Sequence, residues 1–312
     1  MSLLWGKALL SKLKRTNKNE VKYLAICSVV RDEGFYIKEW LDFHLAEGVE
    51  HFVIYDDASS DNLEEILKPY VSLRLVTLRK ANGRTQENVY NDCIELDGKK
   101  FVWVAFIDLD EFLFAPNSDD LPTKLREYEK FTGVFVFWRM FGSGGLLEST
   151  DKGVIADFTR GLPIPRTPEE VQSQNDIWAN SIGGKLLTGR PIQGKSILQI
   201  GKVSEMKVHF PSRYTGTVVD ARGFILEGHP GSSTALASGY VPDYENLVVF
   251  HYWSRSIGAL RRKHARPGIA KWVRKNHDPK SFSSLEGALT YDKAISMQQD
   301  LTLVHRVRSR RI

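Results

Sequence analysis

The chain has 312 residues, 42% hydrophobic and 26% charged, a composition typical of a folded globular protein and not of a disordered or fibrous one. Its net charge of +5 and pI near 9.0 fit an anionic substrate or surface, but no basic-aromatic platform occurs, which argues against a nucleic-acid binder. Two cysteines, Cys27 and Cys93, are too few for a disulfide scaffold and indicate buried free thiols in a reducing cytoplasm.

The N-terminal segment, residues 1–20, combines leucines with lysines and an arginine in an amphipathic pattern. Such a segment suits a helix lying on an anionic membrane surface. A frayed or core-docked terminal helix is the alternative. The segment lacks the long apolar core of a signal peptide, and no apolar run in the chain reaches the roughly 18 residues of a transmembrane helix.

The first third of the chain alternates short apolar strands with amphipathic helices. This alternation predicts an α/β fold with a mostly parallel sheet and right-handed crossovers. The expected strands are 21–30, 51–57, 73–79 and 101–108, and the expected helices are 35–48, 63–70 (ended near Pro69) and 85–96.

The rest of the chain has a less regular pattern. We expect strands at 133–142 and 247–254, and a pair of strands formed by 195–203 with 205–211. Residues 161–194 are polar and rich in proline and glycine, which predicts a mobile loop. From Ile257 onward the chain is basic and predicted to be helical.

The stretch 101–114, FVWVAFIDLDEFLF, places Asp108, Asp110 and Glu111 at the end of a buried strand. Open parallel sheets bind ligands at this edge, and unpaired carboxylates in a dry core are costly. The pattern therefore favours a site for Mg²⁺ or Mn²⁺, which prefer oxygen ligands, over a strand end with solvated acids. No G-x-G-x-x-G or G-x-x-x-x-G-K-[ST] motif supports a dinucleotide or P-loop site.

These motifs occur in an order that resembles GT-A fold glycosyltransferases, more closely the family 2 and family 92 (DUF23-like) group. The resemblance is carried by the segment from YLAICSVVRDEG to YDDASSDN, then WVAFIDLDEFLF, FWRMFGSGG, VHFP and FHYWSRS. It implies a Rossmann-like GT-A domain with helices on both faces at 21–260 and a basic helical C-terminal tail at 261–312. Gly145-Leu146-Leu147 stands where family members often carry a histidine.

The resemblance also implies roles for individual residues. Those expected to line the nucleotide pocket are Ser28, Val30, Arg31, Glu33 and Asp57, and those expected near the nucleotide or its phosphates are Arg84, Gln86 and Asn91. The alternatives are that Asp57 and Glu33 cap helices and that Arg84 is a solvated turn residue.

The resemblance also implies which residues bind the metal and the diphosphate. Asp110 is expected to bind the metal directly and Asp108 to contact both ribose and metal. His251 matches the position of a late metal ligand, with His209 as its competitor and a structural histidine as the alternative. Lys195 is expected to hold the diphosphate.

Transfer with inversion needs a carboxylate base, and three candidates follow the FGSGG break: Glu148, Asp151 and Asp157. We therefore expect a metal-dependent inverting transferase that moves a sugar, galactose by family, from a UDP-sugar to a saccharide or glycolipid acceptor. The expected setting is surface polysaccharide or lipopolysaccharide assembly at the cytoplasmic face of the inner membrane. The alternatives are a nucleotidyltransferase or phosphohydrolase, and a nucleotide-sugar or glycan-binding module without turnover.

Overall fold

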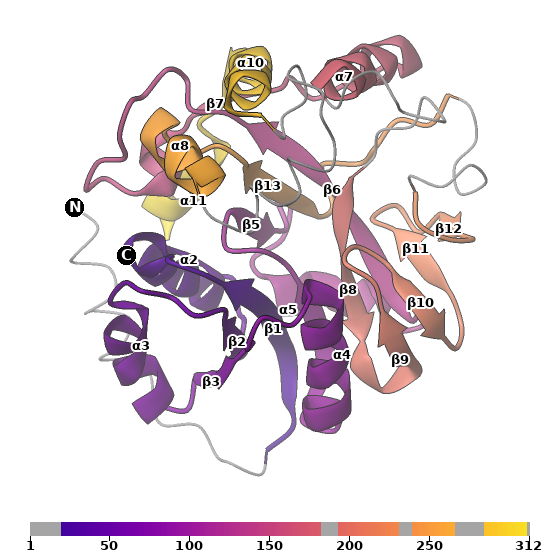
Figure 1. The fold of residues 1–312 in the computed structure, drawn as a ribbon. Helices are drawn as coiled ribbons and strands as arrows, with labels where there is room; N and C mark the ends of the chain where they lie inside the picture. Colours follow the sequence, from indigo (N-terminus) through magenta and orange to yellow (C-terminus); the bar gives the residue numbers. More distant parts are fainter. Residues whose placement is uncertain (1–19, 182–192, 231–238, 266–283, 311–312) are drawn as a thin grey trace. The chain divides into compact units, whose positions relative to one another are not determined.

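A computed structural model describes residues 20–181, 193–230, 239–265 and 284–310, and these fall into two compact units (Figure 1). The first unit contains the chain up to Trp138 together with 193–229 and 243–249, and the second contains 139–192, 230–242 and the chain from Phe250 onward. The domain boundaries expected at 20/21 and 260/261 stay a prediction.

The elements of the first unit begin with the alternating pattern that the sequence indicates. They are β1 (Lys22–Val30), α2 (Gly34–Ala46), β2 (His51–Asp56), α3 (Leu63–Ser72), β3 (Val76–Lys80), α4 (Gln86–Asp97), β4 (Phe101–Phe106), β5 (Glu111–Phe114), α5 (Leu121–Leu125), η1 (Arg126–Tyr128), β8 (Gly194–Gln199), η2 (Ile200–Lys202), β9 (Val203–Met206), β10 (Pro211–Tyr214), β11 (Val218–Asp220) and β12 (Ile225–Leu226).

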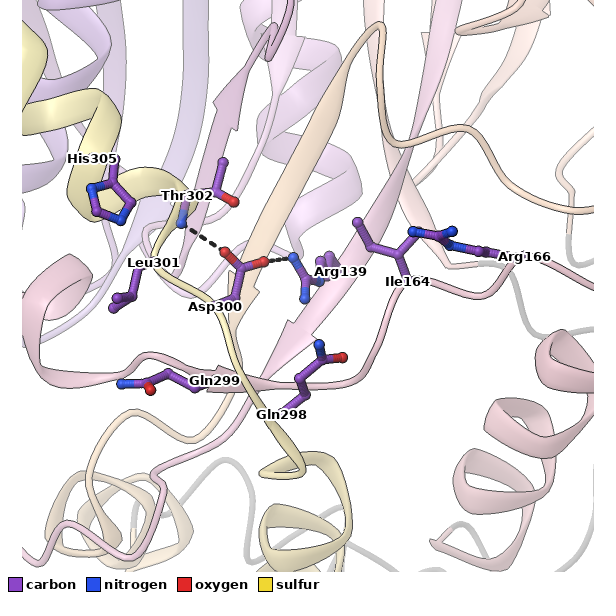
Figure 2. A pocket seen from close by; sticks show the side chains of 9 residues that line it. All are labelled: Arg139, Ile164, Arg166, Gln298, Gln299, Asp300, Leu301, Thr302 and His305. Carbon is purple, nitrogen blue, oxygen red and sulfur yellow. Dashed lines mark hydrogen bonds and ion pairs between the residues drawn. The ribbon is translucent and has the colours of Figure 1, made fainter.

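Two strands pass from one unit to the other, β6 (Gly133–Phe141) and β13 (Val248–Tyr252). The second unit adds α6 (Val154–Asp157), β7 (Arg160–Gly161), α7 (Pro168–Ser181), α8 (Ile257–Ala265), α10 (Leu285–Ile295), β14 (Gln298–Gln299) and α11 (Thr302–Ser309). Strand β14 pairs antiparallel with β7, and a cavity lies beside this short ladder (Figure 2). In the part of the chain that is described, no helix is long and apolar enough to cross a membrane.

The sheet of the first unit is built around β1. This strand pairs in parallel with β2 and β4, and β2 pairs in parallel with β3. On the other side, β8 lies antiparallel between β4 and β6, and β11 extends the sheet parallel to β6. The predicted α/β class with a mostly parallel sheet is confirmed.

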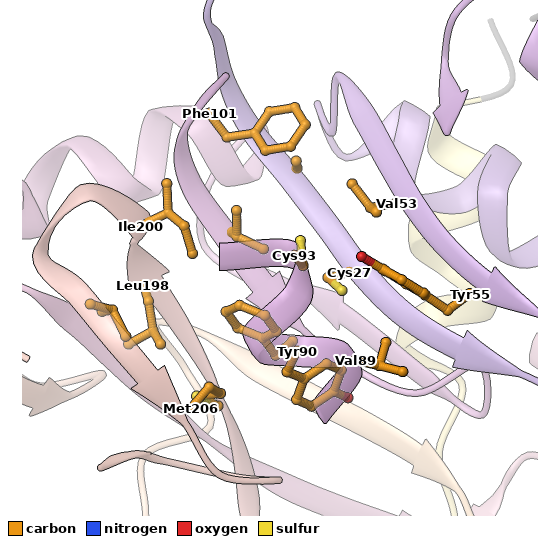
Figure 3. Packing of buried hydrophobic residues seen from close by; sticks show 14 of the residues in the cluster. Cys27, Val53, Tyr55, Val89, Tyr90, Cys93, Phe101, Leu198, Ile200 and Met206 are labelled. Atoms are coloured by element: carbon orange, nitrogen blue, oxygen red, sulfur yellow. The ribbon is translucent and has the colours of Figure 1, made fainter. Parts of the chain in front are cut away.

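Side chains of the sheet alternate between two covered faces. Val53 and Tyr55 of β2 belong to a core cluster with Val89 and Cys93 of α4 (Figure 3). Phe52, the residue before Val53 on β2, points the other way, and Trp40 of α2 packs against it with ring centroids 5.5 Å apart. Alternate side chains of the strand are therefore buried against helices on opposite faces of the sheet, as expected. Cys27 and Cys93 are buried free thiols, which confirms that prediction.

Helix α2 also holds β5, the strand that follows the acidic stretch. The indole Nε1 of Trp40 donates to the carbonyl of Glu111 at 2.7 Å, and the backbone N–H of Leu113 donates to His44 Nε2 at 3.1 Å. Since Nε2 accepts, Nδ1 of His44 carries the proton and donates to the carbonyl of Trp40 at 2.8 Å. Burial lowers the pKa of His44 to about 3, so the ring is neutral.

Three expectations about secondary structure are wrong. Helix α3 does not end near Pro69 but continues to Ser72, because Tyr70 is buried and its hydroxyl donates to Asp42 at 2.7 Å. Within the polar stretch 161–194, predicted as a loop, residues 168–181 form α7. Strand β8 joins the main sheet, so β9 pairs with β10 instead.

Replacing Gly194 with alanine tests the β6–β8 contact. A Cβ there would lie 2.2 Å from the carbonyl oxygen of Val136 on the neighbouring strand. We expect Gly194→Ala to lower the free energy of unfolding in urea by about 1–3 kcal/mol. Gly201→Ala is the matched control, because its Cβ would meet nothing within 4 Å. Equal effects of the two substitutions would contradict the strand pairing.

His44 should make the protein sensitive to acid. Its pKa in the folded state is about 3, below the unfolded value near 6.5, so the folded state binds fewer protons. Its stabilising contribution is complete above pH 6.5 and is lost as the pH falls towards 3. Between pH 6 and pH 4, native protein should lose about 1.4 kcal/mol per pH unit more than His44→Gln. Urea titrations of the two proteins across this pH range measure the difference, and equal slopes would contradict a buried, neutral His44.

Candidate functional site

Asp108 follows β4 at its carboxyl end, and three side chains hold its carboxylate. Oδ1 accepts hydrogen bonds from Gln86 Nε2 at 2.5 Å and from the Tyr90 hydroxyl at 3.4 Å. Oδ2 accepts from Lys195 Nζ at 2.8 Å. The side chain is 31% exposed, so the carboxylate is fixed from inside the protein and still reaches solvent.

Glu111 lies directly beneath this group and is fully buried. Its Oε2 accepts from the backbone N–H of Asp108 at 2.6 Å, and the Asp108 carbonyl accepts from the Glu111 N–H at 3.1 Å. Oε1 has no hydrogen-bond partner among the described residues. Burial raises the pKa of Glu111 well above its usual range; Lys195 opposes this shift, and the charges of Asp108 and Asp110 add to it.

Lys195 is the counter-ion of these acids. Its side chain is 1% exposed, and Nζ lies 2.8 Å from Asp108 Oδ2 and 3.8 Å from Glu111 Oε2. Burial lowers the pKa of Lys195, but the charges of Asp108 and Glu111 outweigh that effect and raise it. A buried carboxylate pair without such a cation would be costly. That Lys195 also holds a diphosphate stays a prediction.

Asp110 is half-buried and lies one residue before β5. Its charge raises the pKa of both Glu111 and Lys195, so it belongs electrostatically to the same group. The predicted roles of Asp108 and Asp110 towards a metal stay predictions, and the structure brings the two residues into one acidic group.

The end of β1 and the loop after β2 form the neighbouring part of this edge. Ser28 is fully buried, and its hydroxyl has no hydrogen-bond partner among the described residues. The carbonyl of Val30 accepts from the N–H of Asp57 at 2.8 Å. Asp57 Oδ2 lies 3.6 Å from an Arg31 guanidinium nitrogen, and its Oδ1 accepts from the Gly83 N–H at 3.3 Å.

The capping alternatives can be compared with this geometry. Asp57 does not cap the following helix, since the N-cap of α3 is Asn62. Glu33 is the N-cap residue of α2, but its side chain makes no capping hydrogen bond. Instead its carbonyl accepts from the N–H of Ile37 at 2.9 Å. Neither carboxylate therefore caps a helix, and that of Asp57 instead contacts Arg31 and the Gly83 N–H.

Arg84 and Asn91 have structural partners. The Arg84 guanidinium donates to Asp92 Oδ2 at 2.6 Å and to the carbonyl of Ala81 at 3.0 Å, so it is not a solvated turn residue. The Asn91 amide donates to the Met206 carbonyl at 3.0 Å and accepts from the Met206 N–H at 2.8 Å. Asn91 therefore ties α4 to β9. Their expected contacts with the nucleotide stay predictions.

The remaining candidates belong to the second unit. Glu148 forms an exposed ion pair with Arg262 at 3.1 Å, and Asp157 accepts from the N–H and hydroxyl of Thr150 at 2.6 and 2.7 Å. Asp151 is exposed and has no ion pair or hydrogen bond in the part of the chain described. His251 is buried, at 6% exposure, in β13. Its competitor His209, in the first unit, has Nδ1 at 3.0 Å from the Gly194 carbonyl.

The donor set of the first unit suits a hard divalent cation. Asp108 and Asp110 offer carboxylate oxygens, which Mg²⁺ and Mn²⁺ prefer, and Mg²⁺ is commonly held by one or two carboxylates with water and phosphate. Within the described ranges, no group of three or more histidine, cysteine or acidic side chains is arranged so that it could hold a metal ion by itself.

Sequence reasoning missed two members of the group. It left the role of Glu111 open and gave none to Tyr90, whose hydroxyl reaches Asp108. A signal for Tyr90 was present, because it stands four residues after Gln86 on one face of α4, and the two side chains hydrogen-bond at 2.7 Å.

Residues 23–223 match the family model described as glycosyltransferase family 92. A family 92 protein of Oryza sativa subsp. japonica is 29% identical over 167 residues, 51% of this chain and 29% of that protein. The galactan beta-1,4-galactosyltransferase GALS2 of Arabidopsis thaliana is 29% identical over 136 residues, 39% of this chain and 26% of that protein. The chain thus spans less than a third of the length of these relatives.

Among solved structures, the chain is similar to S. aureus TarS, with a TM-score of 0.35 and 13% identity over 57% of this chain and 47% of that one. It is also similar to glucosyl-3-phosphoglycerate synthase from Mycobacterium tuberculosis, with a TM-score of 0.28 and 16% identity over 42% of this chain and 48% of that one. Likenesses at these TM-scores add nothing to the assignment of the site.

Removing the buried cation should destabilise the first unit. Lys195→Met leaves Asp108 and the buried Glu111 without their counter-ion, and we expect the free energy of unfolding in urea to fall by about 3–5 kcal/mol. Adding Glu111→Gln to this variant should restore part of the loss. The control is Lys207→Met, whose exposed ion pairs should contribute little. Equal losses for both lysines would show that the buried network is not what stabilises this edge.

Proposed function

We propose that this chain, which belongs to glycosyltransferase family 92, is a metal-dependent enzyme that transfers galactose from UDP-galactose to a saccharide hydroxyl with inversion. The observation that carries the proposal is the extent of the family match. It spans 23–223, which includes Asp57, the group around Asp108, and Lys195. The family expected from the sequence motifs is thereby confirmed, and donor, acceptor and metal remain parts of the proposal.

Galactose is favoured by the relatives. Three of them are named galactan beta-1,4-galactosyltransferases, at 25–29% identity. Because this chain spans at most 27% of their length, their substrates are a guide for choosing the first donor and acceptor to test.

Residues at the ends of β1, β2 and β4 would hold the donor. Asp57, positioned by Arg31 and the Gly83 N–H, would accept hydrogen bonds from the uracil or ribose. The buried hydroxyl of Ser28 has a donor and an acceptor to offer at the same edge. Gln86 and Tyr90 restrict the rotation of the Asp108 carboxylate, which would then contact the ribose.

Asp108 and Asp110 are the residues that would hold Mn²⁺ or Mg²⁺. When bound, the cation supplies positive charge that offsets the negative charge of the departing diphosphate. Lys195 pairs with Asp108 and lies 3.8 Å from the buried Glu111, so the carboxylate of Asp108 keeps a fixed direction. Because these charged side chains are already in position, they need to move little during the reaction.

Three carboxylates remain candidates for the base that accepts the proton of the acceptor hydroxyl. Glu148 is paired with Arg262, and Asp157 accepts both hydrogen bonds of Thr150. Asp151 is exposed and is the first to test, since it has no competing partner in the described residues. His251 as a late metal ligand belongs to the same proposal.

For the biological setting, we keep surface polysaccharide or lipopolysaccharide assembly as the proposal, with a saccharide or glycolipid acceptor. The proposed location is cytoplasmic with peripheral contact to an anionic inner membrane, which the basic termini of the chain favour. Residues 1–19, which motivate that contact, lie outside the described residues.

The direct test incubates the protein with UDP-galactose, Mn²⁺ and β-1,4-galactan oligosaccharides, and follows UDP release and acceptor elongation. The proposal expects UDP release that depends on the acceptor and a product one galactose longer. Acceptor-independent release of nucleotide would indicate a phosphohydrolase or nucleotidyltransferase. Donor binding without any product would indicate a binding module.

Asp110→Asn should strongly lower this activity while leaving the fold intact. Losing one charged metal ligand at the developing diphosphate is expected to lower kcat by about 100-fold or more. Asp176→Asn, an exposed aspartate of α7, is the control and should retain native activity. Full activity of Asp110→Asn with unchanged Mn²⁺ dependence would show that the metal assignment is wrong.

A further inference from the structure

A cavity of about 580 Å³ lies within the second unit (Figure 2). Three segments that are distant in the sequence form it: Arg139 at the end of β6, the stretch after β7, and the stretch from β14 into α11. Its volume is in the range of small-molecule sites, large enough for one or two sugar units. None of the residues considered for the donor or the metal lines it.

A buried ion pair lies at the centre of the lining. Arg139 is 6% exposed and pairs with Asp300, whose side chain is 9% exposed. The Arg139 Nε donates to the carbonyl of Leu162 at 3.2 Å, and Asp300 accepts from the N–H of Thr302 at 2.7 Å. Both side chains are therefore fixed, and their charges cancel.

Two other lining side chains lie on either side of this pair in Figure 2, Arg166 and His305. Both residues are exposed, and neither side chain has an ion pair or hydrogen bond in the described part of the chain. Among the described lining residues, Asp300 is the sole acid, and Arg139 already balances it. The exposed guanidinium of Arg166 is thus a positive charge beside the cavity without an ion pair of its own, and the Glu170 carboxylate accepts from the Arg166 backbone N–H at 2.6 Å.

The remaining polar groups suit hydroxyl-rich ligands. Strand β14 places Gln298 and Gln299 at the cavity, and each exposed amide can both donate and accept hydrogen bonds. Ile164, 44% exposed, supplies an apolar surface for the C–H face of a sugar ring. Amides beside an apolar contact are the usual means of fixing a polar ligand's orientation.

We propose that this cavity binds a saccharide unit that carries an acidic group, a carboxylate or a phosphate. The guanidinium of Arg166 pairs with the acid, for which its planar donors are well suited. The amides of Gln298 and Gln299 bind the hydroxyl groups. That this saccharide is part of the acceptor rests on the proposed transferase function; the binding itself does not.

Isothermal titration calorimetry with full-length protein tests the proposal. The probes are digalacturonate, neutral galactobiose, glucose 6-phosphate and inorganic phosphate. We expect at least one acidic saccharide to bind at least about tenfold more tightly than galactobiose, and preference between the first and third probes identifies carboxylate or phosphate as the acid. Arg166→Ala should weaken that binding about tenfold, whereas Arg308→Ala, an exposed arginine on α11, should not change it.

Three results would overturn the proposal: no binding of either acidic saccharide, equal weakening by Arg166→Ala and Arg308→Ala, or inorganic phosphate binding as tightly as the sugars. UDP binding with Mn²⁺ is measured on the same samples. If the protein binds an acidic saccharide but not UDP, the proposed function is contradicted and this site is not. If it binds UDP but neither acidic saccharide, this site is contradicted and the proposed function is not.

Discussion

The buried ammonium of Lys195 is the interaction on which the acidic edge of the first unit depends. Asp108, Asp110 and Glu111 place three negative charges within four residues, and Glu111 is fully buried. Without a cation inside the protein, such a cluster would either take up protons or open to water. Lys195 lies 2.8 Å from Asp108 and 3.8 Å from Glu111, and its charge opposes the rise in the pKa of Glu111 that burial causes. The side chain of Asp108 is 31% exposed and so still reaches solvent.

The rest of the first unit brings this lysine to the acids. Strand β8 runs antiparallel to β4, with Ala105 opposite Ile197, so the start of β8 lies beside the end of β4. On the other side, α2 fixes β5 through Trp40 and the neutral ring of His44. Core packing of α4 positions Gln86 and Tyr90 above Asp108. The sheet register, the packing of the helices and the charge of Lys195 together fix the position of the Asp108 carboxylate.

The sequence predicted the local elements well and the long-range partners poorly. Strands β1 to β4 and their helices were visible because apolar periodicity and turn residues are local signals. The partnership of Lys195 with Asp108 joins residues 87 positions apart and depends on the insertion of β8 between β4 and β6, which no local pattern encodes. Helix α7 was missed although Pro168, Glu169 and Glu170 are typical of a helix start, because the surrounding prolines favoured a loop.

The central claim is that the first unit binds a nucleoside diphosphate through a divalent cation. Calorimetric titration of the native protein with UDP, in Mn²⁺ and again in EDTA, tests it most directly. The structure and the family predict binding in Mn²⁺ that becomes at least about tenfold weaker in EDTA. Equal affinity in both buffers, or no UDP binding in either, would contradict the account.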